Sequence, residues 1–211
     1  MRLAMLYDSS LEIENLMNSS AVDADAADAD LHAQLRQGNA EAFALIFARH
    51  HRFIYKFIYA MVGEQSLAEE LTQETFLGAF KGIHSLRGEA TLRTWLCGIA
   101  KNTVYKSMRS RRGQEVQSEN EIESLSVVDE KNFAPDRQFL NKELKQLIQT
   151  ALGKLDEDKR LIFTLKELQN LSYNEIAEIT GHSIPKLKTD LHRAKVEMRN
   201  ILRPYLEASE R

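Results

Sequence analysis

Cysteine, proline and glycine are scarce in this 211-residue sequence, and each scarcity excludes a class of protein. Cys97 is the single cysteine, so an internal disulfide and a cysteine-based zinc cluster are excluded, and a reducing compartment is favoured. Three prolines and nine glycines, in a chain rich in helix-forming residues, argue against a barrel or sandwich of strands and turns. We therefore predict an all-α protein, and 43% hydrophobic residues are enough for it to bury cores.

Long apolar runs and enzyme motifs are also missing. The apolar run from Leu3 to Tyr7 is too short for a signal-peptide core, and no run of about 18 apolar residues follows, so we expect a cytoplasmic protein. The sequence has no phosphate-binding glycine loop, no paired-histidine zinc motif and no nucleophile elbow. His50 and His51 are adjacent, so on a helix they point about 100° apart and cannot chelate a metal together. We expect no catalysis, no cofactor, no metal and no small-molecule substrate.

The net charge of -3 is unevenly distributed along the chain. Residues 1–30 have a charge of -6, residues 31–112 have +6, residues 113–140 have -5 and residues 141–211 have +2. This alternation fits folded basic modules that bind a polyanion, connected by acidic segments that do not. The charge of -6 in residues 1–30, next to +6 in residues 31–112, also suggests that the acidic arm covers a DNA-binding surface. Ordinary surface charge is the alternative for the basic modules, and a solvated tail is the alternative for the arm.

Apolar residues recur at helical spacing in two separate blocks. The first block contains three expected helices, which end near Gly63, before Arg87 and near Arg112. Residues 113–139 lose that periodicity and contain Pro135, as expected for a flexible linker. The predicted divisions are a disordered acidic arm (1–30), a first helical domain (31–112), the acidic linker (113–139), a second helical domain (140–206) and a tail (207–211).

The strongest local motif is a short helix, a turn and a basic helix, with the sequence LSYNEIAEITG followed by HSIPKLKTDLHRAKVEMRNIL. Ser172 and Glu175 have the spacing of a capping box, Gly181 is a typical helix terminator, and a last helix is expected from Ile184 to about Leu202. In a helix-turn-helix motif the second helix lies in the DNA major groove and its first turns contact base edges. An ordinary helical hairpin with a solvated basic face is the alternative.

The expected helix at about 91–112 has a second polyanion surface. Arg93, Lys101 and Asn102 lie off its apolar face, as do Lys106 and Arg109. Aromatic side chains stack on unpaired bases of any sequence while basic side chains hold the backbone. Trp95 suits such stacking, but it falls on the apolar stripe, so core packing is its alternative role.

Four segments together resemble a known family. They are EAFALIFARHHRFIYKF, AEELTQETFLGAF, TLRTWLCGIAKN and LSYNEIAEITG with LHRAK after it, in this order along roughly residues 31–205. The chain resembles the extracytoplasmic-function (ECF) sigma factors of the sigma-70 family, which are initiation subunits of bacterial RNA polymerase. The resemblance implies that 31–112 is a sigma region 2 domain and that 140–206 is a sigma region 4 helix-turn-helix domain.

The resemblance also implies a role for individual residues. It implies that Glu70, Gln73 and Glu74 contact the clamp helices of the largest polymerase subunit. Helical spacing agrees, because it places positions 70, 73, 74 and 77 on one face. Contacts to the minus-ten promoter element fall to Arg93, Trp95, Lys101, Asn102, Lys106 and Arg109. Contacts to the minus-thirty-five element fall to Ser183, Lys186, Lys188, Thr189, His192 and Arg193.

The implied partners are therefore core RNA polymerase, promoter DNA and an anti-sigma protein, often membrane-tethered, in a stress or envelope response. One departure from the family pattern is Asp190, because a carboxylate beside phosphate is repulsive unless it accepts from a cytosine or pairs with Lys186 or Arg193. Two other interpretations remain at this point. One is a helix-turn-helix repressor or activator that does not join the polymerase, and the other is a helical adaptor that binds only protein.

Overall fold

The computed structural model describes residues 31, 34, 40–83, 91–115 and 135–208. The predicted acidic arm (1–30) and most of the predicted linker lie outside these residues, as do residues 84–90, where the second expected helix was to end. The elements are α3 (Ala40–Val62), α4 (Gln65–Gly82), α5 (Leu92–Glu115), α6 (Pro135–Lys154), α7 (Glu157–Phe163), the π-helix η2 (Thr164–Leu168), α8 (Tyr173–Thr180) and α9 (Ile184–Ala208). No strand occurs in the described part of the chain, which confirms the all-α prediction.

Local capping signals set the ends of the helices in the C-terminal half. The Ser172 side chain accepts from the Glu175 backbone and the Glu175 carboxylate accepts from the Ser172 backbone at 2.7 Å, which is the predicted capping box of α8. Gly181 ends α8 with φ +72°, a conformation that an L side chain rarely adopts. Asp156 caps α7 by accepting from the Lys159 backbone at 2.8 Å. The two ends of α8 agree with the sequence prediction.

Three boundaries differ from the sequence prediction. Helix α5 continues to Glu115 and α6 begins at Pro135, so both helices extend into the range 113–139. A proline is favourable at the first helical position because its missing N–H has no helical acceptor there. Helix α9 continues beyond Leu202 to Ala208 with Pro204 inside it. Pro204 is exposed and lacks one backbone N–H, so the helix loses one internal hydrogen bond there but does not end. The segment after α7 forms the π-helix η2, which no sequence signal indicated.

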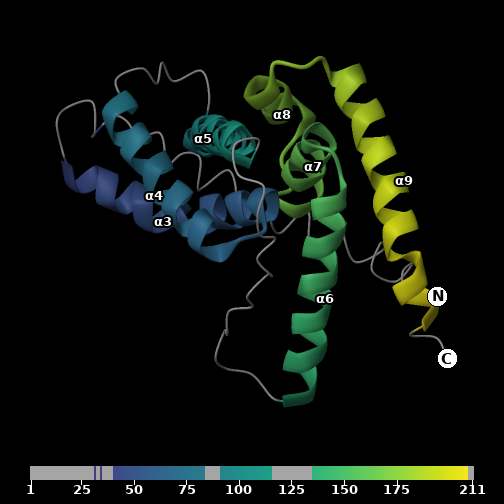
Figure 1. Ribbon diagram of the computed structural model, residues 1–211. Coiled ribbons are helices and arrows are strands. Elements are labelled where there is room, and N and C mark those ends of the chain that lie inside the picture. The colour runs from purple at the N-terminus through teal and green to yellow at the C-terminus, as the bar shows by residue number, and fades with distance from the viewer. Residues whose placement is uncertain (1–30, 32–33, 35–39, 84–90, 116–134, 209–211) are drawn as a thin grey trace, which may run out of the picture.

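The helices form two groups that pack against each other (Figure 1). Helices α3, α4 and α5 bury one set of apolar residues, including Phe57, Phe76 and Leu96. That cluster continues without a break into the C-terminal half, through Leu165 and Ile176. A second cluster joins the end of α6 to α9 and includes Leu152 and Met198. Helices α3 and α5 therefore both pack against the C-terminal helices, α5 mainly on α8 and α3 on α6, α7 and η2. No helix among the described residues is both long and apolar enough to span a membrane.

Candidate polymerase and DNA interface

Helix α4 presents the side chains that were assigned to polymerase binding. Its buried positions include Leu67, Leu71 and Phe76, so the opposite side of the helix faces solvent. Glu70, Gln73 and Glu74 are exposed there, as their predicted common face requires. The Glu74 carboxylate forms an ion pair with the Lys106 ammonium of α5, with 3.3 Å between Oε1 and Nζ, and both side chains remain accessible.

Two large apolar side chains lie on this exposed side of α4. Leu77 is 61% exposed and Phe80 is 54% exposed. The Phe80 ring contacts Phe43 edge to face at 5.1 Å, so only part of it is covered by the core. Apolar side chains surrounded by polar ones are typical of a protein-binding surface. The sequence prediction placed 77 on this face but did not assign it a role, and it did not assign one to Phe80.

The six candidate minus-ten residues divide between two sides of α5. At 100° per residue, positions 95, 102, 106 and 109 fall within about 60° of one another. Asn102, Lys106 and Arg109 are exposed on this side, and Trp95 is half-buried at its edge, packed against the core. The contact with the core agrees with the packing role of Trp95, and its stacking role stays a prediction. We call positions 95, 102, 106 and 109 the open side of α5.

Arg93 and Lys101 lie on a different side of α5, where they contact the C-terminal half. Arg93 stacks on the Phe53 ring at 4.0 Å and donates to the Gln169 carbonyl at 2.5 Å. Lys101 donates to the Ile179 carbonyl at 2.7 Å. Burial lowers the pKa of Lys101, since its ammonium is partly removed from water. The structure therefore does not place the six predicted residues on one continuous surface.

Five of the candidate minus-thirty-five residues lie on the solvent side of α9, and Ser183 directly precedes this helix. Leu187, Leu191 and Ala194 are buried and fix the helix against its neighbours. The six predicted positions, Ser183, Lys186, Lys188, Thr189, His192 and Arg193, are all exposed. Lys186 pairs with Asp190 at 2.6 Å, one of the arrangements that the sequence analysis required for this carboxylate. The ion pair offsets the repulsion that a free carboxylate exerts on phosphate.

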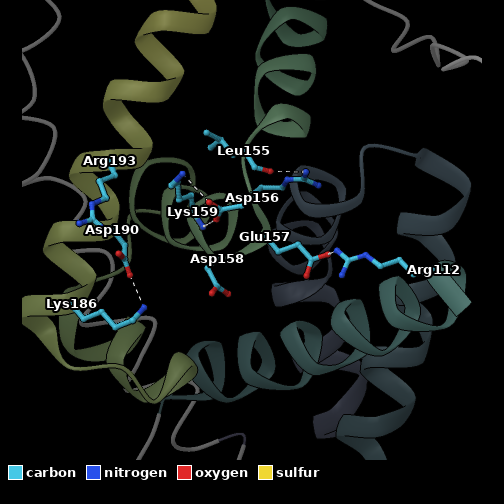
Figure 2. Close-up of a pocket in the computed structure, with 10 residues that line it drawn as sticks. Arg112, Leu155, Asp156, Glu157, Asp158, Lys159, Lys186, Asp190 and Arg193 are labelled. Carbon is cyan, nitrogen blue, oxygen red and sulfur yellow. Dashed lines mark hydrogen bonds and ion pairs between the residues drawn. The ribbon is translucent and has the colours of Figure 1, made fainter.

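A cavity of about 590 Å³ lies where the end of α5, the start of α7 and the first turns of α9 meet (Figure 2). Ten residues line it: Arg112, Leu155, Asp156, Glu157, Asp158, Lys159, Arg160, Lys186, Asp190 and Arg193. The acids at the start of α7 lie between Arg112 on one side and the bases of α9 on the other (Figure 2). Arg112 pairs with Glu157, and Tyr105 donates to Asp158 at 3.2 Å. No sequence motif had connected the acids at the start of α7 with α5 or α9.

The acidic, histidine and cysteine side chains of the described residues bear on metal and redox chemistry. No group of three or more His, Cys, Asp or Glu side chains in this part of the chain is arranged to hold a metal ion. Cys97 is buried, and that burial raises the pKa of its thiol to about 12. A thiol of this kind is a packing group in the region 2 core.

Comparison with known proteins connects these surfaces to one family. The family model for Sigma-70 region 2 matches residues 46–114, and the model for Sigma-70, region 4 matches residues 145–198. The RNA polymerase sigma factor YlaC of Bacillus subtilis is 32% identical over 155 residues, which are 73% of this chain and 88% of the relative. The ECF RNA polymerase sigma-E factor of Haemophilus influenzae is 28% identical over 191 residues, which are 85% of this chain and 97% of that relative.

Solved structures show the same architecture. The sigma factor RpoE of Bartonella quintana, in complex with the anti-sigma factor NepR, aligns with a TM-score of 0.65 and 26% identity over 78% of this chain and 98% of that one. CnrH, in complex with the cytosolic domain of CnrY, has the same fold with a TM-score of 0.64 and 22% identity over 84% of this chain and 98% of that one. From its two sigma regions and its relatives, the chain belongs to the ECF sigma factors of the sigma-70 family, the proteins that direct RNA polymerase to promoters.

Proposed function

We propose that this sigma factor joins core RNA polymerase through the exposed side of α4 and contacts promoter DNA through α5 and α9. The observation that supports it best is that these helices present three separate accessible surfaces on one chain. An acidic and amide surface with apolar side chains lies on α4, while basic and polar surfaces lie on the open side of α5 and on α9. The candidates on α9 and Asn102 and Arg109 on α5 are thus accessible while α4 is occupied, whereas Lys106 is paired with Glu74 of α4.

The polymerase contact is tested most sharply at Leu77, because its exposure means that truncation removes little packing. We expect Leu77→Ala to weaken binding to core polymerase about 5- to 10-fold, in the range of a buried interface anchor. Glu178→Gln on exposed α8 is the control, and Gln73→Ala and Glu74→Gln should also weaken binding. Unchanged affinity of Leu77→Ala and Glu74→Gln would exclude this side of α4 as the interface.

The open side of α5 has the groups needed to hold melted minus-ten DNA. Extruding a base from the duplex costs a few kcal/mol, which stacking and backbone contacts have to offset. Trp95 and Asn102 supply an accessible aromatic edge and an amide, and Lys106 and Arg109 supply charge for phosphates. Arg93 and Lys101 remain part of the proposed site, although both now donate to backbone carbonyls of the C-terminal half.

Helix α9 suits the minus-thirty-five major groove. Lys186, Lys188 and Thr189 occupy its first turns, which contact base edges in a helix-turn-helix protein. Ser183, His192 and Arg193 are placed for base or phosphate contacts around them. We expect Lys188→Ala to change the preferred minus-thirty-five bases, whereas Arg199→Ala on the same helix should lower affinity about equally for all sequences.

In vitro transcription tests the function as a whole. Core polymerase is incubated with and without the protein on fragmented genomic DNA from its source, and the 5′ ends of the RNA are sequenced. We expect new start sites preceded by two shared, spaced sequence elements. DNA binding without new start sites would instead support a repressor, and the absence of salt-dependent DNA binding would support a protein-only adaptor.

The proposal includes regulation and location. The Bartonella relative was solved with an anti-sigma factor bound, which supports an anti-sigma partner for this chain. We place the protein with RNA polymerase in the cytoplasm, without catalytic activity of its own. Co-purification of a partner that blocks core binding, and its loss under inducing stress, would test this control.

A further inference from the structure

Helix α3 has all of its arginine and lysine residues on one side. From Ala42 to Val62 it contains no acidic residue, and its bases are Arg49, Arg52 and Lys56. At 100° per residue these three positions fall within about 60° of the helix circumference, and at 1.5 Å per residue they extend over about 10 Å of its axis. All three side chains are exposed. We call positions 49, 52 and 56 the basic stripe of α3.

The charge of the basic stripe is not neutralised by the rest of the described chain. Arg52 is three residues after Arg49 and four before Lys56, and like charges at these spacings on a helix repel each other. Neither Arg52 nor Lys56 forms an ion pair with another described residue. The hydrogen bonds from the C-terminal half to backbone carbonyls of α3 lie in its last turn, beyond the stripe. The stripe is therefore an accessible row of positive charge that suits an anionic partner.

An exposed apolar side chain lies within the same 60° of α3. Leu45 is 56% exposed, and it precedes Arg49 by four residues and Arg52 by seven, spacings that return to the same side of a helix. A matching partner needs negative charge together with small apolar groups. Residues 21–30 of this chain, AVDADAADAD, have both, because they alternate alanine with aspartate and contain no base. Their four acids are Asp23, Asp25, Asp28 and Asp30.

The place of this acidic segment in the chain supports the same pairing. It ends directly before Leu31, which is buried in the apolar cluster shared by α3, α4 and α5. The segment is therefore attached to the domain that contains the stripe. Ten extended residues span at most about 35 Å, roughly the length of the 23-residue α3. A tether this short gives an effective concentration in the millimolar range, so ion pairs that are weak one by one can hold the two together.

We propose that residues 21–30 bind along the basic stripe of α3 in the same chain, with their aspartates beside the stripe and their alanines against Leu45. The contact covers a row of bases on a helix that we assign to neither polymerase nor promoter. It therefore lowers the affinity of the protein for unrelated polyanions and leaves nucleic-acid binding to α5 and α9. The inference goes beyond the proposed function and does not depend on it.

The first test measures proximity by disulfide formation in the full-length protein. Ala27→Cys is combined with Leu45→Cys, which lies in the stripe, or with the control Ala44→Cys, which is also exposed but lies 100° around the helix. Cys97 stays in place, because it is buried and its pKa of about 12 keeps the thiol unreactive. At about 0.01 M salt we expect the Leu45→Cys chain to form its disulfide about 5-fold faster, the scale of a few accessible ion pairs. At about 1 M salt, where charges are screened beyond about 3 Å, the two rates should be equal.

The second test measures the affinity of the full-length protein for a fluorescent single-stranded oligonucleotide of about 20 nucleotides. The arm variant has four substitutions: Asp23→Asn, Asp25→Asn, Asp28→Asn and Asp30→Asn. The matched control is a linker variant that also loses four acids: Glu119→Gln, Glu121→Gln, Glu123→Gln and Asp129→Asn. We expect the arm variant to bind the oligonucleotide about 3-fold more tightly than the linker variant, because it alone uncovers the stripe. In a background with Arg52→Gln and Lys56→Gln, the arm and linker variants should bind equally.

Each of the other outcomes identifies what the stripe does instead. Equal disulfide rates of the two cysteine pairs at low salt would overturn the proposal, as would an arm variant that gains no more affinity than the linker variant. A larger gain for the linker variant, lost with Arg52→Gln and Lys56→Gln, would mean that the linker covers the stripe. A gain of the arm variant that persists in that background would mean that the arm acts on another basic surface and that the stripe of α3 faces solvent.

Discussion

Arg160 is the residue at which one substitution tests how the helices are held together. Its guanidinium donates to the Met61 carbonyl at 2.7 Å, the Gly153 carbonyl at 2.9 Å and the Leu155 carbonyl at 3.1 Å. These carbonyls lie in the last turn of α3 and at the end of α6, where helices leave carbonyls without partners and favour a nearby cation. One half-buried side chain of α7 therefore caps two helices, one of them in region 2.

Arg160→Met keeps much of the apolar stem and removes all three bonds. A buried hydrogen bond to a charged group contributes about 1.5–3 kcal/mol, but Arg160 is partly accessible and water would replace part of this, so we expect a loss of about 2–4 kcal/mol. The stability of Arg160→Lys should lie between those of the wild type and Arg160→Met, because a single ammonium cannot reach carbonyls on both helices. The exposed Arg199→Met, with a change within about 0.5 kcal/mol, is the control.

Urea unfolding followed by circular dichroism gives these free energies, provided that the slope with denaturant is unchanged between variants. A loss for Arg160→Met no larger than that for Arg199→Met would refute the reasoning. It would mean that water satisfies the helix ends as well as the guanidinium does.

Three further predictions concern local structure. Gly181→Ala should destabilise the protein by about 1 kcal/mol because of its positive φ, whereas Gly153→Ala, where no atom meets the new Cβ within 4 Å, should stabilise it by about 0.5–1 kcal/mol; thermal unfolding compares the two. Ser172→Ala should cost about 1 kcal/mol through loss of the α8 capping box, measured by urea unfolding, and no loss would contradict the role of the cap. Burial raises the pKa of the Cys97 thiol to about 12. The unfolded thiol ionises first as pH rises, so the wild type should lose roughly 1–2 kcal/mol more stability between pH 8 and pH 10 than Cys97→Ala. Equal losses would contradict that shift.

The helix ends of the C-terminal half were predictable because their signals are local. Ser172 and Glu175 are three residues apart, and the side chain of each accepts a hydrogen bond from the backbone N–H of the other. Gly181 ends α8 because glycine alone adopts its backbone angle without strain. The common face of Glu70, Gln73 and Leu77 followed from helical spacing for the same reason. Each of these features depends on residues within one or two turns of one another.

The docking of region 4 on α5 was not predictable, because its acceptors have no sequence signature. Gln169 and Ile179 accept from α5 only through their carbonyl oxygens, a group that every residue has, and Met61 of α3 accepts from Arg160 in the same way. The side-chain pairs, Tyr105 with Asp158 and Arg112 with Glu157, are separated by 53 and 45 residues. No helical period connects positions so far apart, so their pairing depends on the tertiary structure alone.

Amphipathic spacing separates the buried side of α5 from its polar sides, but it does not separate one polar side from another. The charge of +6 in residues 31–112 predicted a polyanion-binding module, and three basic side chains of that module, Arg93, Lys101 and Arg112, are engaged within the chain. Each phosphate contact adds about 0.7 to the salt slope of single-stranded DNA binding. With these side chains engaged, the plot of log affinity against log salt concentration should have a shallower slope than the basic residues of α5 imply. The slope should become steeper in Glu157→Gln, because this substitution releases Arg112. A slope that stays the same would mean that Arg112 gains no phosphate when its carboxylate partner is removed.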